Sequence, residues 1–217
     1  MISGVIFDMD GLMFDTEPVW KSAWAPALAA YGLEELPGLA DAARGMAAPA
    51  TIPVIERFYG EGVDAAGIRR EFDRIAAERI ARGVPKKPGL DELLAYLGEC
   101  DVPCAVASSS PRAMVEGNLR NAGIEGRFAA TVAGGEVANS KPAPDIFLEA
   151  ARRLGTDPAT TLVLEDSFAG VRAGAAGGFV TVMVPDLAQP TDEVRALCRA
   201  VCASLAEVRG LLFAGGL

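Results

Sequence analysis

The stretch GVIFDMDGLMFDTEP, Gly4 to Pro18, joins a short apolar run to a series of acidic residues. The apolar run ends at Asp8, Asp10 follows two positions later, and no lysine or arginine occurs before Lys21. Carboxylates this close to each other repel unless a positive charge neutralises them. The stretch therefore predicts a buried strand that ends in a functional site, with the neutralising charge supplied from elsewhere.

Five short apolar runs, of which this is the first, alternate with segments of helical periodicity. Strands that alternate with helices are typical of a parallel α/β sheet, and nearly all-apolar strands fit a sheet covered on both faces. The sequence therefore predicts a Rossmann-like parallel sheet. The expected strands are Gly4–Phe7, Pro103–Ala107, Thr131–Ala133, Thr161–Leu164 and Val180–Val184.

The expected helices of this α/β part carry recognisable start and stop signals. Leucines recur on one face of residues 89–98, a helix expected to stop at Gly98, and a later helix is expected to end at Gly155. A further helical pattern, residues 167–178, follows the fourth strand. Ser110 is expected to be an N-cap, with Pro111 at the first helical position and Gly123 as the stop signal.

Residues 16–85 interrupt the alternation because they contain no convincing strand. Trp20, Trp24, Leu28 and Tyr31 recur at helical spacing, although Pro26 should kink that helix. A second helix is marked by Ile68, Phe72 and Ile75. We therefore expect a core domain formed by residues 1–15 and 86–217, with a helical domain, residues 16–85, inserted after the first strand.

Composition limits the classes of function. The chain has 217 residues, 51% of them apolar, and a mean hydropathy of +0.26, as expected for a globular protein with a sizeable core. No apolar stretch approaches the roughly 18 residues of a membrane span, and no signal peptide is evident, so a cytoplasmic location is expected. The net charge of −9 disfavours nucleic acid and anionic membranes as partners.

The chain has no histidine, which excludes Ser-His-Asp and Cys-His catalysis. Acid–base chemistry must then come from Asp, Glu, Lys, Tyr or Cys. The four cysteines, at positions 100, 104, 198 and 202, are too few for a disulfide scaffold. Their two C-x-x-x-C spacings leave structural zinc as an alternative, but the apolar run around Cys104 favours small core residues.

Polar residues follow four of the expected strands, at the edge where sites of open parallel sheets lie. They are Asp8 and Asp10; Ser108, Ser109 and Ser110; Lys141; and Glu165 and Asp166. Each group by itself is also typical of the polar residues that form turns after apolar strands. Together they combine hard oxygen ligands suited to Mg²⁺, a lysine suited to a phosphate, and hydroxyl and amide donors for an anion.

These segments carry a family resemblance. DMDGLMFDTE, ASSS, SKPAPD and LEDSFAG resemble, in order, the four motifs of the haloacid dehalogenase-like phosphohydrolases. The inserted helical domain resembles the cap of the subgroup that contains β-phosphoglucomutases and small sugar phosphatases. The resemblance implies a Mg²⁺-dependent phosphatase of small phosphorylated metabolites, most of all sugar phosphates, that acts through an aspartyl-phosphate.

The resemblance also implies roles for single residues. Asp8 would be the nucleophile, and Asp10 the general acid and then the general base. Mg²⁺ would bind Asp8, the main-chain carbonyl of Asp10, and Asp166, with Glu165 as a ligand or a neighbour of the ligands. The phosphate would be held by Ser108, the amide of Ser109, and Lys141.

The expected cap leaves alternatives open. Thr16, Glu17, Trp20 and Arg44 are candidate substrate or hinge residues, whereas Trp20 could simply pack and Glu17 could favour a helix start. Relative to β-phosphoglucomutases, Trp20 replaces a histidine and Ala48 replaces a cap arginine, which puts mutase activity in doubt. A sugar phosphomutase and a non-catalytic phosphometabolite-binding protein remain alternatives. A monomer with a small phosphorylated substrate is expected.

Overall fold

A computed structural model describes residues 2–44, 46 and 48–217. Two compact units make up the chain: Met1–Asp15 with Val84–Leu217, and Thr16–Gly83. The expected return to the first unit, at residue 86, lies two residues beyond this division. In the part of the chain that the structure describes, no helix has the length and apolar character needed to cross a membrane.

The first unit contains a six-stranded parallel sheet, which confirms the predicted fold class. The strand order is β3-β2-β1-β4-β5-β6, so β1 lies in the interior of the sheet between β2 and β4. The strands are β1 Gly4–Phe7, β2 Cys104–Pro111, β3 Ala130–Gly134, β4 Thr161–Glu165, β5 Val180–Met183 and β6 Ala200–Val201. β6 was not predicted, because two residues carry no period.

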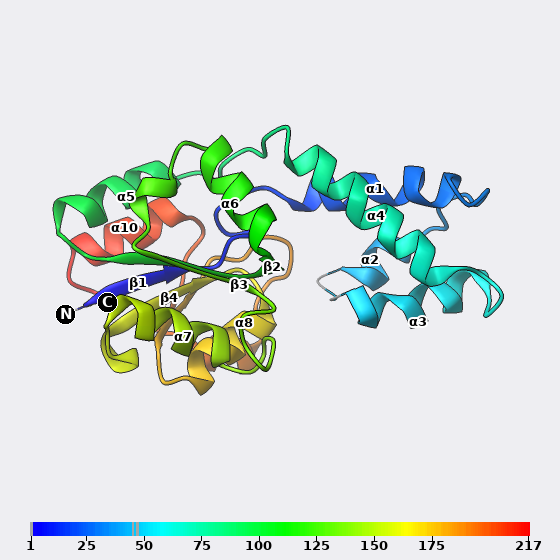
Figure 1. The fold of residues 1–217 in the computed structure, drawn as a ribbon. Coiled ribbons are helices and arrows are strands. Elements are labelled where there is room, and N and C mark those ends of the chain that lie inside the picture. The colour runs from blue at the N-terminus through cyan, green and yellow to red at the C-terminus, as the bar shows by residue number, and fades with distance from the viewer. Residues whose placement is uncertain (1, 45, 47) are drawn as a thin grey trace. The chain divides into compact units, whose positions relative to one another are not determined.

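Helices cover both faces of this sheet (Figure 1), with α5, α6 and α10 over one face and α7 and α8 over the other. Alternate side chains of β1 serve the two faces: Val5 and Phe7 pack with Leu93, whereas Ile6 packs with Phe147 on the opposite side. Burial on both faces explains why the strand sequences are almost uniformly apolar. The helices are α5 Leu90–Glu99, α6 Arg112–Asn121, α7 Asp145–Leu154, α8 Phe168–Ala176, α9 Asp192–Leu197 and α10 Leu205–Phe213.

The predicted start of α6 is wrong. β2 extends through Ser110 to Pro111, and Pro111, with ψ of 145°, takes the N-cap position without a side-chain cap. The helix therefore begins at Arg112. The Ser110 hydroxyl bonds the side chain of Asp10 instead of capping the helix.

The second unit contains helices and no strand among its described residues, as predicted. Its helices are α1 Glu17–Ala29, α2 Leu39–Ala43, α3 Ala48–Tyr59 and α4 Ala65–Ile80. Phe72 of α4 is buried between two tryptophans of α1, at ring-centroid distances of 4.2 Å to Trp24 and 5.8 Å to Trp20. α1 continues through Pro26 and ends before Tyr31, which is exposed rather than part of the buried stripe. Gly45 and Ala47, near the expected cap loop, lie outside the described residues.

Candidate active site

The strand order brings the expected motifs to one edge of the sheet. β2, β1 and β4 are neighbours, so their carboxyl ends place Ser108, Asp8 and Glu165 side by side. Lys141 reaches the same place from the loop that follows β3, the next strand outward. Residues more than 130 positions apart thus form one cluster, which the sequence predicted from strand ends alone.

Lys141 lies between two carboxylates. Its Nζ is 2.5 Å from Asp8 Oδ1 and 2.5 Å from Glu165 Oε1, and it also donates to the carbonyl of Ala107 at 3.4 Å. The side chains of all three partners in the ion pairs are less than a tenth exposed. The ammonium lies 4.8 Å from the ring centroid of Phe147, which adds a cation–π contact.

Glu165 is fixed on its other side by the start of α8. Its Oε2 accepts hydrogen bonds from the backbone N–H and the hydroxyl of Ser167, both at 2.9 Å. Ser167 is the N-cap of α8 and accepts from the N–H of Gly170 at 3.1 Å. A β-carbon at Gly170 would overlap the carboxyl group of Glu165. Both oxygens of Glu165 are therefore bound by protein donors, and only glycine fits at position 170.

Asp10 is held by two hydroxyls from the end of β2. Its Oδ2 accepts from Ser110 Oγ at 2.7 Å and from Ser108 Oγ at 3.3 Å, and the Ser110 N–H donates to Ser108 Oγ at 3.0 Å. Ser109 between them is exposed. Ser110 was predicted to cap a helix, but its hydroxyl bonds Asp10, the candidate acid–base residue.

Three carboxylates form the only group of potential metal ligands found among the described residues. Ligand oxygens of Asp8, Glu165 and Asp166 lie within 4.8 Å of one another. Burial, opposed by Lys141 and reinforced by Glu165 and Asp10, raises the pKa of Asp8 to about 8. Burial and the neighbouring carboxylates raise the pKa of Asp166 well above its usual value. This hard-oxygen set with excess negative charge fits Mg²⁺.

The glycine after Asp10 allows this cluster to form. Gly11 has φ of +84°, and a β-carbon there would overlap Asp166 Oδ2. The loop that carries Asp10 can therefore lie directly against Asp166 only with glycine at this position.

Sequence reasoning missed two residues beside the cluster, Lys87 and Asp186. Asp186 follows β5, the neighbour of β4, and forms an ion pair of 2.6 Å with Lys87. The signal that could have found Asp186 is the one used for the other strands, since it is a carboxylate just beyond the end of an apolar run.

The four candidate cap residues belong to the second unit. Arg44 forms an ion pair with Glu17 at 2.7 Å and a shorter one with Asp41. Thr16 is buried at the N-cap of α1 and makes no side-chain capping bond. Trp20 is half-buried against Phe72, so at least part of its ring serves packing.

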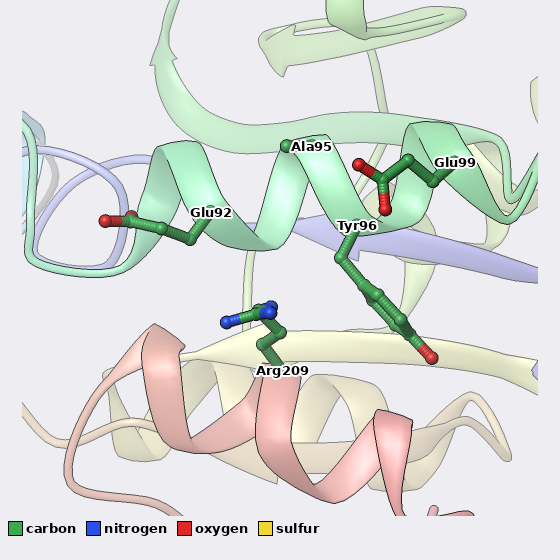
Figure 2. Close-up of a pocket in the computed structure, with 5 residues that line it drawn as sticks. All are labelled: Glu92, Ala95, Tyr96, Glu99 and Arg209. Atoms are coloured by element: carbon green, nitrogen blue, oxygen red, sulfur yellow. The ribbon is translucent and has the colours of Figure 1, made fainter.

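A separate hollow of about 210 Å³ lies on the face formed by α5 and α10. Figure 2 shows Glu92, Tyr96 and Glu99 projecting from α5 near Arg209 of α10. None of its lining residues belongs to the acidic cluster or follows a strand end. The hollow therefore has no part in the chemistry considered below.

Comparisons with known proteins agree with the motifs. The family model for haloacid dehalogenase-like hydrolases matches residues 2–178. Fructose-1-phosphate phosphatase YqaB of Escherichia coli is 33% identical over 84% of this chain and 96% of its own length. Hexitol phosphatase B of the same organism is 31% identical over 95% of this chain and 94% of its own.

Among solved structures, β-phosphoglucomutase of Clostridium difficile superposes with a TM-score of 0.79, covering 100% of this chain and 97% of that one. At 21% identity this likeness shows the fold alone.

Proposed function

Because the chain belongs to the haloacid dehalogenase-like hydrolases, we propose that it is a Mg²⁺-dependent phosphatase of small phosphorylated metabolites, chiefly sugar phosphates. The predicted enzyme class agrees with the relatives, which are phosphatases by name. The observation that carries the proposal is the buried Lys141 between Asp8 and Glu165, next to Asp166. This arrangement pairs a carboxylate nucleophile with the charges that a phosphate needs.

Asp8 is the nucleophile in this proposal. One of its carboxylate oxygens attacks phosphorus, beside the Lys141 ammonium; the new bond from Asp8 to phosphorus forms while the bond from phosphorus to the substrate oxygen breaks. A carboxylate needs no histidine to activate it, which suits a chain without histidine. Water then attacks the phosphorus of the aspartyl-phosphate, releasing inorganic phosphate and restoring Asp8.

Asp10 moves the protons of both steps. In its protonated form it gives a proton to the leaving alcohol oxygen, and as a carboxylate it then takes a proton from the attacking water. Ser108 and Ser110 hold Oδ2 and so fix the direction of the carboxyl group. Positioning of this kind supplies most of the catalysis in phosphoryl transfer.

Lys141, Ser108 and the amide of Ser109 hold the phosphate oxygens in this proposal. Their donors offset the negative charge that the acidic cluster would otherwise present to an anion.

The cation would be held by Asp8, Asp166 and the main-chain carbonyl of Asp10. When bound, Mg²⁺ supplies charge stabilisation to the phosphoryl oxygens. Glu165 already has both oxygens bound, one by Lys141 and one by Ser167, which favours its role as the residue that orients Lys141. Its buried carboxylate would then act on the cation site through charge rather than by direct ligation.

Substrate choice is assigned to the helical unit, which we propose acts as a cap. The Glu17–Arg44 pair offers a carboxylate for sugar hydroxyls and a guanidinium for an anionic group. Thr16 would be a hinge residue, and Trp20 would combine packing with an apolar wall. A phosphomutase shares every core residue, but Trp20 in place of histidine and Ala48 in place of arginine favour hydrolysis. We also propose that the protein is a cytoplasmic monomer.

Phosphate release tests the proposal directly. The purified protein is assayed with p-nitrophenyl phosphate and a panel of sugar phosphates in Mg²⁺, with nucleotides and phosphoglycolate for comparison. Asp8→Asn should lower kcat at least about a thousandfold, and EDTA should abolish turnover until Mg²⁺ is restored. Asp101→Asn is the matched control, because asparagine tolerates the φ of 54° at this exposed turn.

Two results would contradict the proposal. Turnover unaffected by Asp8→Asn or by EDTA would exclude the mechanism. Conversion of a hexose 1-phosphate to the 6-phosphate faster than phosphate release would favour the mutase.

A further inference from the structure

Lys87 contacts two segments at the edge of the acidic cluster, the loop that follows β1 and the end of β5. Its Nζ lies 2.6 Å from Asp186 Oδ1 and 3.8 Å from Asp15 Oδ1, and its backbone N–H donates to the carbonyl of Met13 at 2.8 Å. The side chains of Lys87 and Asp186 are 24% and 12% exposed, so this pair is better shielded from solvent than most ion pairs of the molecule. Shielding makes its contribution larger than that of a surface pair.

The first of these segments is the loop that carries Asp10, to which Met13 and Asp15 belong. The chain leaving β1 pairs with residues 85–87: the Asp15 N–H donates to Pro85 at 2.9 Å, and Phe14 forms an antiparallel bridge with Lys86. The second segment is the end of β5, which carries Asp186. The Lys87–Asp186 pair thus joins the base of the Asp10 loop to β5, the neighbour of β4, and Asp166 directly follows β4.

Asp186 also lies close to the cation site. A β-carbon built on Gly11 would overlap Asp166 Oδ2 and would lie 3.4 Å from Asp186 Oδ2, so both carboxylates flank the same glycine. The closeness of Gly11 to Asp166 depends on where the loop is held. Lys87 is bonded to that loop, and Asp186, its partner in the ion pair, follows β5 on the side of the sheet where Asp166 lies.

We propose that the Lys87–Asp186 pair is a positioning device, which holds residues 9–15 against Asp166 and so sets the cation affinity of the site. The proposal rests on the proposed function for its consequence in catalysis, but the holding of the loop does not. Neither residue touches the phosphate or the reacting atoms in this assignment.

The test compares Lys87→Met and Asp186→Asn in the full-length protein. Hydrogen–deuterium exchange of residues 11–15 is measured without metal, and Mg²⁺ affinity is measured by calorimetry. Both variants should speed exchange of the loop amides by about tenfold and weaken Mg²⁺ binding by about tenfold, the lower end for residues that orient ligands. The double variant should be no worse than either single one.

The opposite sign of the two charges makes the test decisive. If the residues acted only through their charge on the cation, Lys87→Met would tighten Mg²⁺ binding while Asp186→Asn weakened it. Weakening by both variants supports positioning; opposite effects, or unchanged exchange at residues 11–15, overturn it. Lys87→Arg keeps the ion pair and should restore both readouts.

A matched control is the exposed pair of Arg172 and Glu193, at 2.9 Å, whose side-chain contacts are with each other and with neither the acidic cluster nor residues 9–15. Glu193→Gln removes one carboxylate from an ion pair and should leave loop exchange and Mg²⁺ affinity unchanged. Because neither readout needs turnover, an inactive wild-type protein would count against the proposed function alone. In an active protein, kcat should fall in both variants. KM should change by less than about twofold, because the substrate contacts are kept.

Discussion

Lys141 is the residue on which the buried charges of the site converge. From the sequence it was expected to bind phosphate and to offset the excess negative charge of the site. Its contacts with Asp8 and Glu165 identify the two carboxylates that it neutralises, which burial would otherwise penalise. The pKa of Lys141 is raised by these carboxylates against the opposing effect of burial. The lysine therefore stays charged throughout the range in which the enzyme would work.

Ser110 gives a prediction that separates its two possible roles. Ser110→Ala removes the 2.7 Å hydrogen bond to Asp10 Oδ2 but no helix cap, because Pro111 holds that position. We expect kcat to fall by about tenfold, corresponding to one hydrogen bond to a charged or reacting group, and the pH profile of kcat to shift. The free energy of unfolding should change by less than about 0.5 kcal/mol. The measurements are steady-state kinetics against pH and urea denaturation.

Thr191 is the contrasting cap. Its hydroxyl accepts from the Val194 N–H at 3.3 Å at the start of α9. Thr191→Ala should cost about 1 kcal/mol of stability and leave kcat unchanged. A Ser110→Ala variant that loses stability and keeps its pH profile would restore the capping role.

At the scale of elements, the site depends on how closely α8 approaches β4. Ser167 caps the helix and binds Glu165 at the end of the strand, and Gly170 leaves the space that the Glu165 carboxyl group fills. The start of α8 and the position of the Glu165 carboxylate therefore depend on each other. The LEDSFAG segment carries the signal in its sequence, but the reason for its glycine is visible only in the packing.

Gly170→Ala should break this arrangement. The added methyl group has to displace Glu165, so we expect a loss of about 1–3 kcal/mol in the free energy of unfolding, as for an overpacked core. Turnover should fall because Lys141 loses one of its two carboxylates. Denaturant unfolding and the phosphate-release assay measure these effects.

Gly117→Ala is the matched control for this substitution. Gly117 lies inside α6, and a β-carbon there would meet no atom within 4 Å. Alanine should stabilise the helix by up to about 1 kcal/mol with turnover unchanged. Equal effects of the two substitutions would mean that space at Gly170 is not what matters.

At the scale of the whole molecule, we expect protons and the proposed cation to compete for the acidic cluster. The folded-state pKa of Asp8, about 8, is higher than its ordinary value of 3.8. A raised pKa means that the metal-free folded state binds more protons than the unfolded state between these values. The stability that protonated Asp8 contributes to the folded state is therefore lost as pH rises from about 4 through 8. A bound cation should compensate for this loss most at the upper end of that range.

The expected outcome is a thermal shift by Mg²⁺ that grows with pH. At about 100 times the dissociation constant, Mg²⁺ should raise Tm by roughly 5–10 °C at pH 8, and by much less at pH 5.5, where protons occupy the ligands. Differential scanning calorimetry with and without Mg²⁺ measures the shift. Asp8→Asn should reduce the pH dependence, and an equal shift at both pH values would contradict the competition.

The sequence by itself determined five of the six strands, the helical insert and the candidate core set Asp8, Asp10, Ser108, Lys141, Glu165 and Asp166, because apolar periods and local motifs are properties of neighbouring residues. Only the tertiary structure decided the partners of Ser110, the need for Gly170 and the pairing of Lys87 with Asp186. These depend on distances between segments as much as 100 positions apart, which no local pattern encodes. The strand order of the sheet sets those distances, and it also brings carboxylate oxygens of Asp8, Glu165 and Asp166 within 4.8 Å of one another.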